Sequence, residues 1–134
     1  MRVDPAVAAT AARYHLTLGG TAEAQAIIEA SLEREWNAAL VALYGEAAGE
    51  DPIPQIQRAE NWLRDHARDP ALLLALGKLC MKRELWGKAQ SYIEASLALE
   101  PTHDGHMTLA ALMERIGKPQ EAVRHFRRSA ELAG

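Results

Sequence analysis

The chain has 134 residues, with 15 basic and 18 acidic side chains and a formal net charge of −3. That length suits one domain, and a mildly acidic chain without a basic stripe is not a dedicated nucleic-acid binder. One cysteine cannot form an internal disulfide, and no apolar run reaches the ~20 residues that a membrane-spanning helix needs.

Start and stop signals divide the first 35 residues into two helices. Asp4-Pro5 opens the first, because Asp accepts hydrogen bonds from free N–H groups and Pro has no N–H to leave unpaired. This helix runs to about Leu18 and ends at Gly19-Gly20, which favours a left-handed stop. Thr21 is expected to cap the second helix. Its inward residues are predicted to be Ala24, Ile27, Ile28, Ser31 and Leu32.

The second pair, 36–69, is irregular. A breaker-rich segment, 45–54, separates its helices, and prolines at 52 and 54 predict an extended connection. The helix that follows is expected from about Pro54 to Ala67. The pair's apolar residues are Trp36, Leu40, Leu43, Tyr44, Ile56, Ala59, Trp62 and Leu63.

The third pair, 70–102, shows the clearest pattern, with two amphipathic helices joined by a tight turn. Gly77 and Ala89 lie where two helices need small residues to approach closely. In the fourth pair, 103–134, Gly117 ends the first helix and Pro119 opens the second. The inward residues of that last helix are predicted to be Ala122, Val123, Phe126 and Ala130.

Short motifs recur along the chain. IIEASLE at 27–33 returns as YIEASLA at 92–98, so that Ser31 and Ser96 are 65 residues apart (96 − 31). A spacing of about 34 residues between helical pairs is the tetratricopeptide (TPR) pattern. The sequence therefore predicts an all-α, TPR-like right-handed solenoid of about four repeats, or about eight helices. The whole chain, 1–134, forms a single domain with repeats at approximately 5–35, 36–69, 70–102 and 103–134.

TPR geometry also predicts a binding surface. The first helix of each pair lines a concave groove, and residues one step off the core face project into it. Arg13, Lys78, Lys82 and Arg115 would give this groove a mildly basic floor, which suits an acidic ligand. The alternative is that these charges only solvate the helix faces. The full predicted set is Arg13, Thr17, Leu74, Lys78, Met81, Lys82, Met107, Glu114 and Arg115.

No constellation of residues predicts catalysis. His103 and His106 are three residues apart and could converge, but a zinc site needs further ligands. Cys80 lies on an apolar helix face without a histidine partner, which is typical of a buried structural thiol. We therefore expect no enzyme, no metal site and no cofactor. The alternative is a haem or porphyrin domain in which His15, His103 or His106 ligates iron.

A narrower resemblance covers most of 36–133. Its marks are Leu43-Tyr44-Gly45, Trp62-Leu63, Asp69-Pro70, Leu76-Gly77, Leu85-Trp86-Gly87-Lys88-Ala89 and Ser96-Leu97. These resemble the C-terminal TPR region of the HemY family, which is associated with proteobacterial haem biosynthesis.

That resemblance implies protein partners, among them haem-biosynthetic enzymes, at the bacterial inner membrane. Family members resemble membrane proteins with two N-terminal membrane helices, which this chain lacks. The chain is therefore expected to be a soluble fragment of a longer, membrane-anchored protein. The leading hypothesis is a non-catalytic interaction scaffold that binds proteins through its groove. The sequence also leaves a homodimer as an alternative, because no clearly polar capping helix follows the last repeat.

Overall fold

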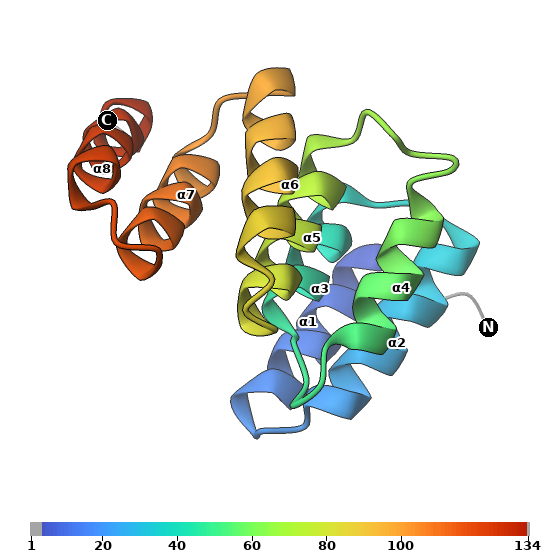
Figure 1. Ribbon diagram of the computed structural model, residues 1–134. Helices are drawn as coiled ribbons and strands as arrows, with labels where there is room; N and C mark the ends of the chain where they lie inside the picture. The colour runs from blue at the N-terminus through green and yellow to red at the C-terminus, as the bar shows by residue number, and fades with distance from the viewer. Residues whose placement is uncertain (1–3, 134) are drawn as a thin grey trace.

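The computed structural model describes residues 4–133, and the regular structure in this range is helical (Figure 1). The helices are α1 (Pro5–Thr17), α2 (Thr21–Arg34), α3 (Ala38–Glu46), α4 (Ile53–Trp62), α5 (Pro70–Lys82), α6 (Trp86–Leu99), α7 (His103–Arg115) and α8 (Pro119–Ala133). Two helices fall within each of the four ranges that the sequence suggests.

The helices stack into a solenoid in which α8 lies at one end and the first pair, α1 and α2, lies on the far side of α5 and α6 from it (Figure 1). Within pairs, α1 packs on α2, α5 on α6 and α7 on α8. Between pairs, α3 packs on both α1 and α5, while α6 packs on α7. Each pair therefore buries its apolar faces against its neighbours, as a repeat solenoid requires.

Helix starts follow the predicted capping chemistry at two places. Asp4 Oδ1 accepts a hydrogen bond from the Ala6 N–H at 2.7 Å, and Asp69 Oδ1 accepts one from the Ala71 N–H at 2.9 Å. The prediction for Thr21 is wrong. Gly20 occupies the N-cap position of α2, and no side chain caps that helix, because the Gly19-Gly20 turn is so short that Thr21 is already helical.

Three interhelical turns share one backbone conformation. Gly19 and Gly117 both have φ +80°, which confirms the predicted glycine stops. At the equivalent point between α5 and α6, Glu84 has φ 62°. A side chain in this left-handed region costs roughly 1–2 kcal/mol compared with ordinary helical conformations.

The second pair departs from the regular arrangement. No Cα atom of α3 lies within 8 Å of one in α4. Contact between the two helices is made by large rings, since Tyr44 and Trp62 have centroids 5.1 Å apart. Helix α4 ends at Trp62, earlier than the predicted Ala67. The reason lies in the following turn, where the His66 ring stacks on Trp36 with centroids 3.7 Å apart. The Trp36 indole N–H also donates to Asp69 Oδ2 at 2.7 Å.

The core is centred on α5, whose Leu72, Leu76 and Leu79 are fully buried. The predicted close approach at Gly77 is confirmed, since a Cβ atom there would lie 2.5 Å from Ile93 Cγ1. Such spacing leaves no room for a side chain between α5 and α6.

Two inward predictions for α8 are wrong. Val123 is 53% exposed, and Ala130 is exposed as well. The buried face of α8 instead runs through Ala122 and Ser129, and the hydroxyl of Ser129 donates to the His103 carbonyl. Val123 and Ala130 each lie one residue, or about 100°, away from that face.

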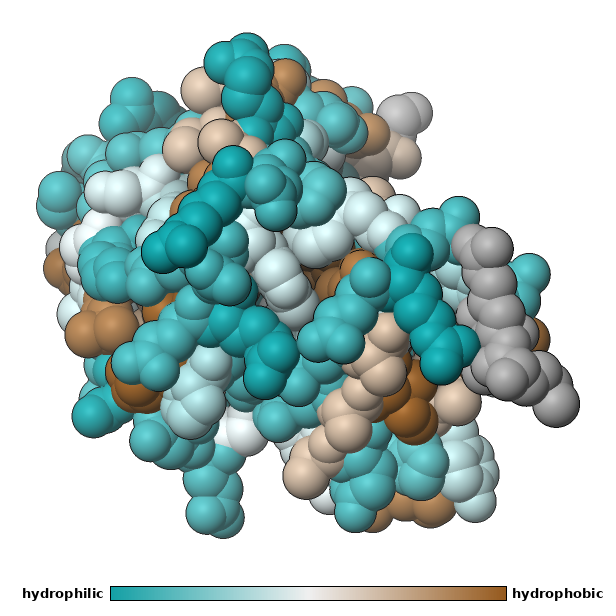
Figure 2. Space-filling model, turned by 90° about the vertical axis from the view of Figure 1, so that its right-hand side faces the viewer, coloured by the Kyte–Doolittle hydropathy of each residue, from teal (hydrophilic) through white to brown (hydrophobic). Residues whose placement is uncertain are grey.

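The surface is largely polar. Figure 2 shows one side of the molecule, where hydrophobic side chains form small separate patches among hydrophilic ones. Among the helices of residues 4–133, none combines the length and the apolar character that crossing a bilayer requires.

Candidate partner-binding groove

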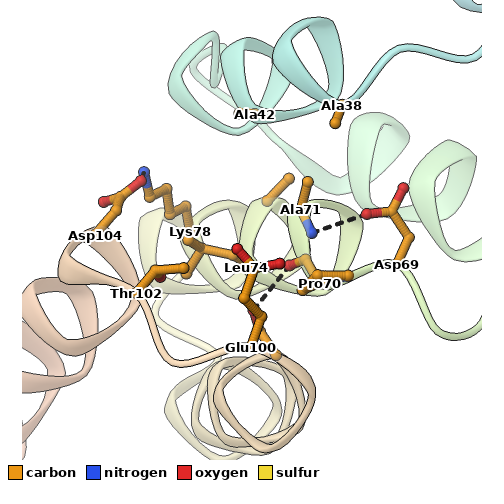
Figure 3. A pocket seen from close by; sticks show the side chains of 12 residues that line it. Ala38, Ala42, Asp69, Pro70, Ala71, Leu74, Lys78, Glu100, Thr102 and Asp104 are labelled. Carbon is orange, nitrogen blue, oxygen red and sulfur yellow. Dashed lines mark hydrogen bonds and ion pairs between the residues drawn. The ribbon is translucent and has the colours of Figure 1, made fainter. Parts of the chain in front are cut away.

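A pocket of about 400 Å3 opens on α5, between α3 and the start of α7 (Figure 3). Ala38 and Ala42 of α3 face Leu74 across it, and Ala71 and Ala75 complete an apolar wall. Small side chains on α3 create this space, because an alanine there leaves Leu74 partly uncovered. The other lining residues are Asp69, Pro70, Lys78, Ser96, Glu100, Thr102 and Asp104.

Carboxylates dominate the charge of this pocket. Its lining includes three carboxylates, those of Asp69, Glu100 and Asp104, and one basic side chain, that of Lys78. The Lys78 ammonium lies 2.8 Å from Asp104 Oδ2 and 3.7 Å from Glu46 Oε1, with its side chain only 18% exposed. Its charge is therefore largely neutralised. Carboxylates outnumber the basic side chain among the lining residues of this pocket, whereas the basic floor expected for the groove as a whole stays a prediction.

The walls of the pocket are held by hydrogen bonds from several elements. The Ser96 hydroxyl of α6 donates to the Pro70 carbonyl at 2.8 Å. Asp69 accepts the Trp36 indole N–H with one oxygen and caps α5 with the other. Thr102 caps α7 by accepting from the Gly105 N–H at 2.9 Å. The pocket is thus preformed, and a ligand would not have to order it.

The predicted groove residues do not all meet there. Leu74 and Lys78 line the pocket, whereas Met81 packs against the core. Arg115 lies over the Trp86 ring at 5.4 Å and close to Glu84, near the turn between α5 and α6. The remaining members are exposed along α1, α5 and α7 outside the pocket: Arg13, Thr17, Lys82, Met107 and Glu114. Their role as binding residues stays a prediction.

Sequence reasoning missed the acidic part of the pocket. Asp69 and Thr102 precede helices, and Glu100 follows one. The predicted set was taken from within the first helix of each pair, so the residues that precede those helices and the end of α6 were left out. The Asp-Pro helix start at 69–70 was a usable signal, because it fixes a carboxylate at the mouth of the groove.

The candidate iron-binding histidines do not converge. The His103 ring contacts the Ser129 hydroxyl at 2.6 Å, and the His106 ring contacts that of His125, with Nδ1 atoms 3.1 Å apart. His15 belongs to α1, which has no Cα atom within 8 Å of α7 or α8. None of the three lines the pocket on α5. Haem or porphyrin binding therefore stays a prediction that this geometry does not favour.

The thiol and the metal-ligand candidates complete the survey of reactive side chains. Cys80 is fully buried, and burial raises the pKa of its thiol to about 11, which keeps it protonated. Within residues 4–133, no group of three or more His, Cys, Asp or Glu side chains is placed to hold a metal ion.

Comparison with known proteins supports the fold. No family model matches the sequence, and no curated protein matches it. Two solved structures are similar: MamA MSR-1 C2, with a TM-score of 0.59 and 18% identity over 98% of this chain and 78% of that one, and MamA AMB-1 P212121, with a TM-score of 0.56 and 18% identity over 97% and 73%. Both have a TPR-like architecture.

The chain is an all-α, TPR-like solenoid. This confirms the fold class predicted from the repeat pattern. At 18% sequence identity, the similarity supports the fold alone. The function therefore has to be argued from the groove.

Proposed function

We propose that this chain is a non-catalytic interaction module that binds a protein segment in its concave groove. The pocket on α5 supports this proposal most strongly, because it combines an apolar wall with fixed carboxylates at its rim. Peptide sites commonly pair apolar pockets with a few placed polar groups.

The proposed partner presents an apolar side chain next to a Lys or Arg. The apolar side chain would enter between Ala42 and Leu74, where alanines leave room. The cation would lie near Asp69 or Glu100, neither of which forms an ion pair with a side chain of residues 4–133. A partner of this kind would bind less tightly as the salt concentration rises, because charge pairs near a surface are screened.

A random peptide library displayed on phage tests this proposal. Selection on the purified protein is expected to enrich peptides in which an apolar residue neighbours Lys or Arg. Replacing Ala42 by Phe would fill the pocket from an exposed position and should weaken binding of a selected peptide at least ~10-fold, or ~1.4 kcal/mol. Val123→Phe on α8 is the matched control, since Val123 is exposed outside the groove.

A second variant separates the two ligand chemistries. Lys78→Met removes the pocket's lysine and leaves its carboxylates, so a cationic peptide should bind more tightly. A loss of affinity would indicate the acidic ligand that the sequence suggested. Enrichment of acidic peptides, or equal binding to the Ala42→Phe variant, would contradict the proposal.

We further propose, from the HemY resemblance alone, that the partners include haem-biosynthetic enzymes at the bacterial inner membrane. In this proposal the chain reaches the membrane through a region outside the given sequence. Capture from a haem-synthesising proteobacterial extract tests it, with the Ala42→Phe variant as the control. Direct haem binding stays the alternative prediction, and a saturable Soret shift near one equivalent, lost on replacing a histidine, would support it.

A further inference from the structure

The outer face of α1 is an exposed apolar stripe. Val7, Tyr14 and Leu18 are 58%, 61% and 66% exposed, and Ala11 lies between them. A shallow hollow of about 500 Å3 runs along this face, lined by Ala6, Val7, Thr10, Ala11 and Tyr14. Apolar side chains clustered in this way usually mark an interaction surface.

The repeat shows what such a face does elsewhere in the chain. Aligning Gly19 with Glu84, the positive-φ residues of the two turns, places Val7 at the position of Leu72, Ala11 at Leu76 and Tyr14 at Leu79. All three leucines of α5 are fully buried, because α3 and α4 pack on α5. The α1 stripe therefore continues the interface that joins successive helical pairs, but no helix of residues 4–133 covers it.

The opposite end of the solenoid does not complement this stripe. The exposed side of α8 carries Arg124, Arg127, Arg128 and Glu131. Packing α8 of one copy on α1 of the next would place these charges against apolar side chains, at a cost in desolvation. The hollow along α1, in contrast, has no charged residue in its lining.

The stripe also complements itself. Residues 7, 11, 14 and 18 follow the alternating spacing of four and three that forms a two-helix seam. In an antiparallel pair, Ala11 of one copy faces Tyr14 of the other, and Val7 faces Leu18. Each small side chain then meets a large one. A parallel pair would place two tyrosines together and two alanines together.

We propose that two copies of this chain associate through antiparallel packing of their α1 helices. This dimer does not depend on the proposed peptide pocket, which lies on α5 and has no α1 residue in its lining. One helix per copy is a small contact, so the dimer should be in exchange with monomer, with a dissociation constant on the order of micromolar or weaker.

Sedimentation analysis of the purified protein from about 1 to about 500 μM tests this proposal. The expected result is a concentration-dependent monomer–dimer equilibrium. Tyr14→Glu places a charge in the seam at an exposed position and should weaken association at least ~10-fold. Val123→Glu, a similar change on α8, should leave it unchanged. Circular dichroism of both variants checks that they fold.

Three results would overturn the proposal. The first is a monomer at every concentration. The second is a dimer that survives Tyr14→Glu. The third is an assembly that keeps growing with concentration, which would indicate head-to-tail packing of α8 on α1.

Cross-linking tests the orientation. Since the native Cys80 is buried, a thiol introduced on α1 is the reactive one. Ala11→Cys protein mixed with Tyr14→Cys protein should form mixed disulfides faster than Ala11→Cys protein forms them with itself. The reverse order would indicate parallel helices and contradict the antiparallel arrangement.

Discussion

The second and third helical pairs arise from the same repeat, yet different interactions hold them together. In the third pair, Gly77 lets α5 and α6 approach until Ile93 fills the space between them. In the second pair, α3 and α4 stay apart. The Tyr44 hydroxyl reaches Glu29 of α2 at 2.6 Å, and the Gln55 amide donates to the Ala47 carbonyl at 3.0 Å. Close backbone approach defines the third pair. In the second pair, the Trp62 ring at the end of α4 contacts the rings of Trp36 and Tyr44, and polar contacts tie both helices to their surroundings.

Helix α4 is also tied to its neighbours by long side chains. Glu60 lies 2.8 Å from the Lys88 ammonium of α6 and accepts the Tyr92 hydroxyl. The hydrogen bond from Lys88, and after it the one from Tyr92, holds the pKa of the Glu60 carboxyl below its usual value. In α3, burial and the Glu29 carboxylate raise the pKa of the Tyr44 hydroxyl above its usual range. The comparison shows that a repeat can give up close backbone approach between its two helices where large aromatic rings and polar side chains fill the wider space between them.

The largest expected effect belongs to the regular pair. Leu76→Ala removes a fully buried side chain from the centre of the core and should cost about 2–5 kcal/mol in the free energy of unfolding. Urea denaturation measures this loss. A cost below ~0.5 kcal/mol would be typical of a surface position and would contradict the packing described for α5.

A smaller loss is expected in the irregular pair. Gln55 accepts from the Gly49 N–H and donates to the Ala47 carbonyl. Gln55→Ala leaves the Gly49 N–H without this partner, while the Ala47 carbonyl still accepts from Gln25. The expected cost is about 1–3 kcal/mol in unfolding free energy. Gln57→Ala, in the same helix but exposed, is the control. Equal stability of the two variants would mean that polar contacts do not hold this connection.

The turn within the third pair predicts a gain in stability. Glu84→Gly relieves the left-handed conformation at φ 62°, and the Arg115 pair that it loses is exposed and 3.8 Å long. The variant should be more stable by roughly 0.5–1 kcal/mol, after allowing for the flexibility of glycine in the unfolded chain. A lower thermal midpoint than that of the native protein would show that the turn is not strained.

The smallest expected effect is a pH dependence in the fourth pair. Burial lowers the pKa of His106, and His125 and Arg128 lower it further. The stability that depends on neutral His106 is therefore complete above the unfolded value of ~6.5 and is lost as pH falls through the folded pKa. The thermal midpoint should fall between pH 7.5 and pH 5.5, and His106→Gln should flatten that slope. An unchanged slope would assign it to other histidines.

Sequence patterns predicted most helix starts and stops, although they misplaced the cap of α2 and two inward residues of α8. Asp4, Asp69, Gly19 and Gly117 have the roles that capping and stop signals predict. The early end of α4 could not be predicted, because it depends on the stacking of His66 on Trp36, 30 residues away in sequence (66 − 36).

The site was only half predictable for a similar reason. Leu74 and Lys78 were found from their helix face. The ion pair that neutralises Lys78 joins α5 to Asp104 of α7, and no local pattern places those two residues together. The pocket also depends on Ala38 and Ala42 of the irregular pair, whose position relative to α5 the repeat pattern does not give.

The pocket at the junction of the second and third pairs is therefore the place to test the proposed binding site. The decisive measurement is an amide NMR titration of the protein with a peptide selected from the phage library. The largest changes in amide chemical shift are expected around the pocket, at Ala38, Ala42, Leu74 and Thr102. Changes confined to α1 or α8, with these four amides unmoved, would contradict the assignment of the groove as the binding site.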